Sequence, residues 1–148
     1  MKITKKGEYA LRAMMDLSLN HKKGPVHIKD ISEREKIPKK FLEQILLELK
    51  KAGLLQSARG MGGGYSLIKP PDEITLARVF RTIDGPLAPL SCVSKLAHVS
   101  CPEEKNCGLY SVIKDVRNAI SEILEGVTLD DVCKRTKGDL KKRMKAIK

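Results

Sequence analysis

The sequence has no tryptophan, and its three tyrosines and two phenylalanines make up only 3% of 148 residues. It also lacks any apolar run close to the roughly 18 residues that a membrane-spanning helix needs. With so few aromatic residues, the core must be built from Leu, Ile, Val, Ala and Met, and this composition favours helices. We therefore expect a mainly α protein, organised as one compact domain with an appendage, that has no membrane partner.

A signal peptide is also missing. The opening lysines are followed by Glu8 and a segment of mixed polarity, whereas a signal peptide continues with an apolar stretch. We therefore expect a cytoplasmic protein. In that reducing compartment, the four cysteines are more often thiols or metal ligands than disulfides.

The net charge of +11 is unevenly distributed. Residues 1–69 carry 15 Lys and Arg against 7 Asp and Glu, residues 70–133 carry 6 against 10, and residues 134–148 carry 8 against 1. A basic surface attracts the phosphate backbone of nucleic acid, so the first segment is the expected site of that contact. We interpret residues 134–148 as a solvated, partly disordered basic tail, with a second polyanion contact as the alternative.

Apolar spacing predicts a first helix over residues 8–20 and two more that form a helix-turn-helix. Residues 29–36 form a short amphipathic segment that ends before Pro38, and the next helix runs from there to Gly53. Two weak strands, residues 54–58 and 65–68, then flank a glycine-rich turn, a pattern typical of a β-hairpin wing. The glycine run lacks the Gly-Lys-Ser/Thr ending of a phosphate-binding loop, which argues against nucleotide binding.

The chain therefore divides into four parts. Residues 1–85 form a winged helix-turn-helix domain, including a helix over 75–84, and residues 86–108 form a long irregular loop. Residues 109–133 contain a strongly periodic helix, whose apolar face predicts a homodimer, and a short final helix that begins at a capping box. Residues 134–148 are the basic tail.

The second helix of a helix-turn-helix enters the major groove with its first residues facing the bases. The wing arginine suits a minor groove, and the hydroxyl and glycine amides beside it suit phosphate. The alternative is that the lysines only solubilise an exposed helix. The candidate DNA-binding residues are Lys39, Lys40, Glu43, Gln44, Ser57, Arg59, Gly60, Gly62 and the amide of Gly63.

Three cysteines, Cys92, Cys101 and Cys107, lie within 16 residues of the irregular loop. Three thiolates on one loop suit an iron-sulfur cluster or another soft metal. The spacing alone leaves zinc, a redox disulfide and three unrelated thiols open. Cys133 lies beside Val132 on an apolar helix face, so we expect a buried thiol there.

The motifs resemble, in order, those of the Rrf2 family of bacterial transcription regulators, especially its cluster-binding branch. The resemblance covers nearly the whole chain and rests on KITKKGEYALRAM, DISEREKIPKKFLEQIL, RGMGGGYSL, EITLARVFRTIDGP, the cysteine loop and VTLDDV. It implies a homodimer on an operator in double-stranded DNA. It also implies that residues around Gln44 read the major groove and Arg59 the minor groove, and that Glu43 tunes which sites the cluster-free form accepts.

The resemblance further implies a 2Fe-2S cluster or, in some relatives, a 4Fe-4S cluster, with Cys92, Cys101 and Cys107 as ligands. Two departures affect the fourth ligand. The first gap between cysteines has eight residues instead of five, and Tyr110 stands where the branch has a histidine. His98 and Glu8 of the partner subunit are the main candidates, and the others are Glu103, Glu104, Asn106 and an external thiol.

We therefore predict a regulator, a repressor or an activator, of iron-sulfur biogenesis or related stress genes, with no small-molecule substrate. The alternatives within the family are a cluster-free regulator of sulfur or cysteine metabolism and a relative that senses nitric oxide or iron. The three loop cysteines argue against the cluster-free branch. A thiol enzyme or redox carrier is the alternative from another class, and no oriented base or apolar pocket supports it.

Overall fold

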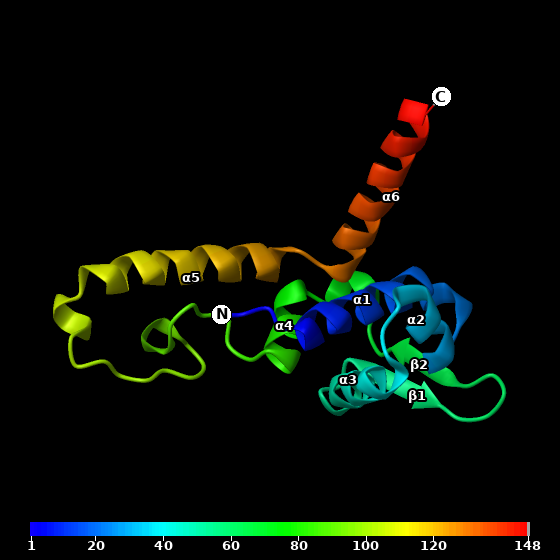
Figure 1. Cartoon of the computed structure of the whole chain (residues 1–148), viewed down its shortest axis with the longest axis horizontal. Helices are drawn as coiled ribbons and strands as arrows, with labels where there is room; N and C mark the ends of the chain where they lie inside the picture. The colour runs from blue at the N-terminus through cyan, green and yellow to red at the C-terminus, as the bar shows by residue number, and fades with distance from the viewer. Residues whose placement is uncertain (148) are drawn as a thin grey trace.

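Within residues 1–147, which the computed structural model describes, the chain forms six α-helices and a two-stranded antiparallel sheet (Figure 1). Short 3₁₀ turns lie in several of the connections. The predicted mainly α fold with a hairpin wing is confirmed. The bounds are α1 Lys5–Leu19, α2 Ile28–Glu35, α3 Lys39–Lys51, β1 Leu55–Ala58, β2 Gly64–Leu67, α4 Leu76–Ile83, α5 Gly108–Gly126 and α6 Leu129–Ile147.

Helix α1 begins earlier than residue 8 because Thr4 caps it. The Thr4 hydroxyl accepts a hydrogen bond from the Gly7 amide at 3.0 Å, as a helix N-cap should. The Thr4 amide donates to the Asp84 carboxylate at 3.1 Å, so the start of α1 is joined to the end of α4. A Cβ on Gly7 would lie 2.1 Å from Asp84 Oδ2, so a larger residue at position 7 would displace the Asp84 carboxylate.

The core lies between α1, α2, α3 and the base of the hairpin. Each helix turns one apolar face inward at a spacing of three and four residues. Its members are aliphatic, as the scarcity of aromatic residues predicts. The buried set includes Ala10, Ala13, Met14, Leu17, Ile31, Leu42, Ile45, Leu46, Leu49, Leu55, Leu67 and Leu129.

A tight turn joins α2 to α3 and forms the predicted helix-turn-helix. Lys36 has φ of 53° at the end of α2, and its amide donates to the carbonyl of Ser32. Ile37 is buried in the turn, and Pro38 is the N-cap residue of α3, where its ψ of 127° keeps it outside the helical region. The turn thereby fixes the angle between the two helices.

The wing is braced by a third piece of extended chain. Val26, just before α2, forms a bridge with Tyr65 through two backbone hydrogen bonds of 2.8 Å. Gly64 has φ of +139°, and a Cβ there would lie 2.3 Å from the Val26 carbonyl oxygen. The start of β2 can therefore approach Val26 only because residue 64 is glycine.

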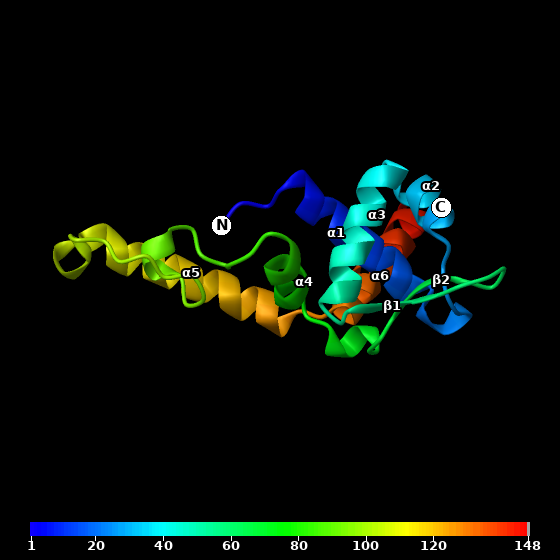
Figure 2. The same cartoon turned by 90° about the horizontal axis from the view of Figure 1, so that it is seen from below.

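Helix α5 extends away from this body, and the loop before it lies along its far end (Figures 1 and 2). Its C-terminal part contacts α4, where Ile120 and Leu124 pack against a small cluster of Ala77, Phe80 and Leu87. Helix α5 is thus anchored at one end only.

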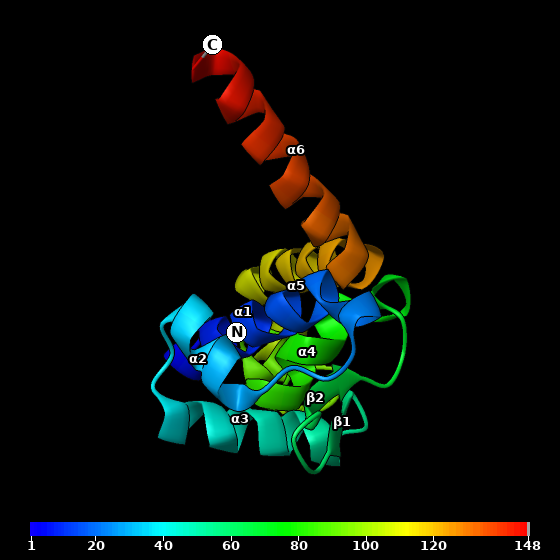
Figure 3. The same cartoon turned by 90° about the vertical axis from the view of Figure 1, so that its right-hand side faces the viewer.

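The expected short final helix with a separate tail from residue 134 is wrong. Helix α6 runs from Leu129 to Ile147 and projects from the body on the side opposite α3 (Figure 3). The capping box is confirmed, because the Thr128 amide donates to Asp131 Oδ2 at 2.9 Å and the Asp131 amide donates to the Thr128 hydroxyl. Good helix formers continue the helix through the basic segment. Lys148 lies outside the described residues.

Candidate functional site: nucleic-acid interface and cysteine loop

Helix α3 and the hairpin lie together along one edge of the molecule, opposite α6 (Figure 3). The buried face of α3 holds the helix in place, so its other face is presented outward. All four residues predicted at the start of this helix, Lys39, Lys40, Glu43 and Gln44, are exposed. The helix therefore offers a rigid row of charged and polar groups to a partner.

Leu47 lies one turn further along α3 than Glu43 and Gln44, and it was not among the residues predicted from the sequence. It is 47% exposed, although it is a large apolar residue in a helix whose other leucines are buried. An exposed apolar residue on such a face can contact a thymine methyl group. Its position, three residues after Gln44, was the available signal.

The wing residues stand in an extended and exposed hairpin. Ser57, Arg59, Gly60 and Gly62 are all exposed, and the Lys50 ammonium donates to the Ser57 hydroxyl at 2.7 Å. This bond joins α3 to β1. The expectation of an open amide at Gly63 is wrong, because that amide donates to the Gly60 carbonyl at 3.0 Å and closes the turn.

His27 is a second residue that the sequence analysis missed. Its ring Nε2 lies 3.2 Å from the carbonyl oxygen of Met61, so the Nε2–H tautomer donates to the wing tip. His27 is also the N-cap residue of α2. The contact spans 34 residues of sequence, and no local pattern signals it.

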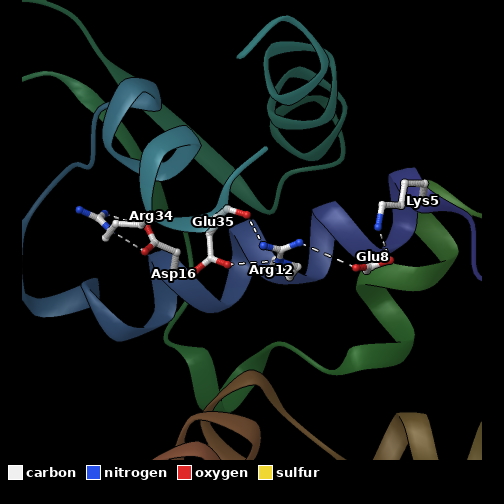
Figure 4. Close-up of polar contacts among 6 residues, drawn as sticks. All are labelled: Lys5, Glu8, Arg12, Asp16, Arg34 and Glu35. Carbon is white, nitrogen blue, oxygen red and sulfur yellow. Dashed lines mark hydrogen bonds and ion pairs between the residues drawn. The ribbon is translucent and has the colours of Figure 1, made fainter. Parts of the chain in front are cut away.

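A chain of ion pairs follows α1 toward the helix-turn-helix (Figure 4). Glu8 contacts Lys5 at 3.1 Å and Arg12 at 3.8 Å. Arg12 in turn contacts the Glu35 carboxylate at 3.3 Å, and it also donates to the Glu35 carbonyl. Glu35 ends α2, so the chain connects the candidate ligand Glu8 to the turn before α3.

The structure brings two of the three loop cysteines to one place. Cys101 and Cys107 line an open cavity of about 790 Å³ together with Glu104 and Tyr110. Cys92 is half-buried and lies near enough to contribute to the electrostatics of the Tyr110 phenol. Among the side chains that the structure describes, no three His, Cys, Asp or Glu groups converge closely enough to hold a metal ion.

Glu104 is the centre of a small polar network in this loop. His98 Nε2 lies 3.3 Å from its carboxylate, and Tyr110 and the Cys101 backbone also donate to it. Desolvation raises the pKa of Glu104, but the three hydrogen bonds together hold it below the ordinary value. Desolvation, followed by the hydrogen bond with Glu104, raises the pKa of Tyr110. Tyr110 is therefore a neutral donor to a charged carboxylate.

Arg117 fastens the loop to α5. It is 8% exposed, and its guanidinium donates to the Val93 carbonyl at 2.6 Å. Val93, next to Cys92, is itself buried. This anchor was not predicted from the sequence, although the position of Arg117 within an apolar helical stripe was a visible signal.

The outer face of α5 carries the exposed apolar stripe that the helical period predicted. Leu109, Val112, Val116 and Ile123 are 40–63% exposed. They follow one another at helical spacing along one side. Exposed apolar residues on an ordinary protein surface are scattered singly, whereas these four form a continuous stripe.

Cys133 is buried on α6 as expected, with 6% exposure, and burial followed by the nearby Asp130 raises the pKa of its thiol. Because the thiolate is the nucleophilic form, the raised pKa makes Cys133 a weak nucleophile, as expected for a buried structural cysteine. None of the helices in residues 1–147 has the length and apolar content to cross a membrane.

Comparison with known proteins agrees with this arrangement. The family profile described as "Rrf2: Iron-dependent Transcriptional regulator" matches residues 3–135. The HTH-type transcriptional regulator IscR of Aliivibrio salmonicida is 39% identical over 132 residues, which cover 89% of this chain and 77% of that protein.

Two solved structures have the same fold. CymR, the global cysteine regulator of B. subtilis, superposes with a TM-score of 0.77 at 32% identity and covers 91% of this chain and 98% of that one. IscR of T. potens superposes with a TM-score of 0.72 at 33% identity, covering 92% and 88%. The chain is thus similar to regulators of two different names, and the similarity does not single out either.

Proposed function

Because this chain belongs to the Rrf2 family of transcription regulators, we propose that it is a cytoplasmic, DNA-binding sensor that responds to an iron-sulfur cluster in residues 86–108. Membership makes it a transcription regulator and not an enzyme. The observation that carries the proposal is the grouping of Cys101, Cys107 and their polar neighbours in one cavity at the end of α5. The genes under its control are those of iron-sulfur biogenesis or related stress responses.

In the proposed binding mode, α3 enters the major groove of double-stranded DNA. Gln44 and Lys40 reach base edges or phosphates, and Lys39 and Glu43 flank them. The wing places Arg59 in the adjacent minor groove, with Ser57, Gly60 and Gly62 against the backbone. The exposure of all these residues along one edge supports this mode.

The proposed assembly is a homodimer through α5. Its exposed stripe lies on a helix of 19 residues, about 28 Å long, which is anchored to its own body at one end. A second copy of the same helix is self-complementary under two-fold symmetry and covers the stripe. Two recognition helices then meet two half-sites of one operator.

The donor set fits an iron-sulfur cluster in its chemistry. Cys92, Cys101 and Cys107 supply three soft thiolates from an irregular loop, and the loop must close further for the three sulfurs to converge. When bound, a cluster supplies a redox-active centre. Arg117 holds the Val93 carbonyl beside Cys92, while Glu104 positions His98 and Tyr110 around the other two cysteines.

We favour His98 as the fourth ligand because it is tied to Glu104, which lines the cavity of Cys101 and Cys107. Glu8 of the partner subunit is the alternative. In one protomer, Glu8 is already paired with Lys5 and Arg12. Its recruitment by a partner's cluster would release Arg12 and change the contact with Glu35, so the two ligand choices imply different routes to α3.

Anaerobic reconstitution with ferrous iron and sulfide tests the proposal. The wild-type protein should become coloured, and its visible absorption should rise in proportion to its bound iron. Most of the absorption and of the bound iron should be lost in each of three variants, Cys92→Ala, Cys101→Ala and Cys107→Ala. Cys133→Ala is the matched control, because its thiol is buried in α6, and it should load normally. A colourless wild type, or loop variants that load like Cys133→Ala, would refute cluster binding.

The cluster-free alternative is a regulator of sulfur or cysteine metabolism. Two observations favour it: the loop cysteines do not converge in the described residues, and the fold is similar to that of CymR. Under this alternative, a protein with all three loop cysteines replaced by alanine keeps both its DNA affinity and its regulation.

A further inference from the structure

The wing tip carries an apolar side chain that nothing in the chain covers. Met61 is 100% exposed, and it stands in a turn that the Gly63 amide closes onto the Gly60 carbonyl at 3.0 Å. Gly60 has φ of +95°, a conformation that glycine adopts at little cost. Met61 is therefore the one side chain at the corner of a turn made otherwise of glycine.

The position of this tip is fixed by the helix-turn-helix. A Cβ on Gly63 would lie 2.3 Å from the Ala58 carbonyl oxygen, so the backbone just before β2 lies in close contact with the end of β1. The His27 ring holds the Met61 carbonyl at 3.2 Å, and His27 is the N-cap residue of α2. The tip is thus held by a short turn and by a direct contact to the DNA-reading domain.

The surroundings of Met61 are suited to a polyanion. Between Glu48 and Asp72 the sequence has no acidic residue, whereas it has Lys50, Lys51, Arg59 and Lys69. Figures 1 and 2 show the turn of the hairpin projecting beyond the body. An apolar contact at this place therefore faces the same partner as Arg59, which stands two residues earlier.

We propose that Met61 enters the DNA minor groove beside Arg59 and wedges its thioether against one base step, partly unstacking it. Methionine is among the apolar side chains that minor-groove proteins use in this way. This inference rests on the proposed placement of Arg59 in the minor groove. Arg59 provides attraction to the groove, and Met61 provides the apolar contact.

This contact gives the protein a means of reading sequence that its hydrogen bonds lack. A wedge costs least at pyrimidine-purine steps, which unstack easily. The operator should therefore carry such a step where the wing tip lies, and replacing it by a stiff A-tract step should weaken binding. The effect should disappear in a protein that lacks the apolar side chain.

Two substitutions separate the apolar contact from the shape of the tip. Met61→Gln keeps the length and removes the apolar end, while Met61→Leu keeps an apolar group. The probes are DNA duplexes enriched by the purified protein from a random-sequence pool, with 2-aminopurine placed at successive steps. Ile3→Gln is the matched control, because Ile3 is 55% exposed and lies outside the interface.

Met61→Gln should bind about tenfold more weakly, a loss on the scale of burying one large apolar side chain. Met61→Leu and Ile3→Gln should stay within about threefold of wild type. The salt dependence of the Met61→Gln affinity should match that of wild type, because no phosphate contact is lost. At one step of the duplex, the fluorescence of 2-aminopurine should rise when wild type binds, because the base unstacks, and it should not rise when Met61→Gln binds.

If Met61→Gln binds DNA with wild-type affinity and raises 2-aminopurine fluorescence as wild type does, while Arg59→Ala binds more weakly, the wedge is overturned and the proposed DNA-binding mode stands. If Arg59→Ala also binds like wild type, the wing does not enter the minor groove, and both the wedge and the proposed placement of the wing are wrong. Equal melting temperatures of the variants establish that the exposed tip was changed without loss of folding.

Discussion

Arg34 on α2 and Asp16 on α1 form a bidentate ion pair, in which Arg34 Nε donates to Asp16 Oδ1 and Arg34 Nη2 donates to Asp16 Oδ2, both at 2.8 Å (Figure 4). Asp16 is buried, whereas Arg34 is half exposed. The hydrogen bond with Asp16 is the main cause that raises the pKa of the Arg34 guanidinium, although desolvation opposes it. The pair holds the first helix of the helix-turn-helix against the core.

Replacing Arg34 by alanine leaves the buried Asp16 carboxylate without its partner. We expect the free energy of unfolding to fall by about 1–2 kcal/mol, measured by urea denaturation, because a buried acceptor loses its donor. Arg34→Lys should recover only part of this, since an ammonium group does not match both oxygens. Lys29→Ala, an exposed basic residue of the same helix, should have little effect, and an equal loss there would contradict the account.

The capping box of α6 makes stability depend on pH. Hydrogen bonds from the Thr128 amide and hydroxyl lower the pKa of Asp131 in the folded protein. The stability that ionised Asp131 adds to the folded protein is therefore fully present above the ordinary carboxyl pKa, near 4. It is lost as the pH falls toward the lowered pKa that Asp131 has in the folded protein. Asp131→Ala should lower the Tm by roughly 2–4 °C at pH 7, with the gap to wild type narrowing below about pH 4.

Asp115→Ala is the control for that experiment, because Asp115 is exposed on α5. Its Tm should follow wild type throughout. A gap between Asp131→Ala and wild type that stays constant down to pH 3 would exclude the ionised capping box as its source.

The two classes of DNA contact predict different defects. Gln44→Ala should lose about 1–3 kcal/mol of discrimination at one base pair, measured by binding to singly substituted duplexes. Lys40→Ala, if it loses a phosphate contact, should weaken binding to all duplexes alike and reduce the slope of log affinity against log salt by about one. Lys114→Ala, a basic residue on α5, should change neither quantity.

Alanine at His98 and glutamine at Glu8 separate the two candidates for the fourth ligand. We expect His98→Ala to shift the visible absorption of the reconstituted protein and to speed cluster loss, because one of the four cluster ligands is removed. Glu8→Gln should keep the wild-type spectrum. The reverse pattern would assign the ligand to the partner subunit.

Most of the DNA-reading half could be predicted from the sequence because its signals are local. Pro38 and Gly53 mark the ends of α3, and the apolar spacing between them gives its buried face. The glycine-rich turn gives the wing, and the Thr128–Asp131 pattern gives the start of α6. Each of these depends on neighbours within a few residues.

The parts that could not be predicted depend on contacts between distant segments. His27 reaches Met61 across 34 residues, and Arg117 reaches Val93 across 24. The length of α6 was misjudged because like charge was given more weight than helix propensity. In the cysteine loop, spacing indicates the donors but not how far the loop closes around them.

The most direct test of the account is the affinity of cluster-loaded and cluster-free protein for one duplex enriched from a random pool, measured anaerobically by fluorescence anisotropy. We predict that the two forms differ by at least about fivefold, a typical coupling between two sites. Protein with Cys92, Cys101 and Cys107 all replaced by alanine should keep the cluster-free affinity after reconstitution. Equal affinity of the two wild-type forms would contradict a sensor that acts through an iron-sulfur cluster.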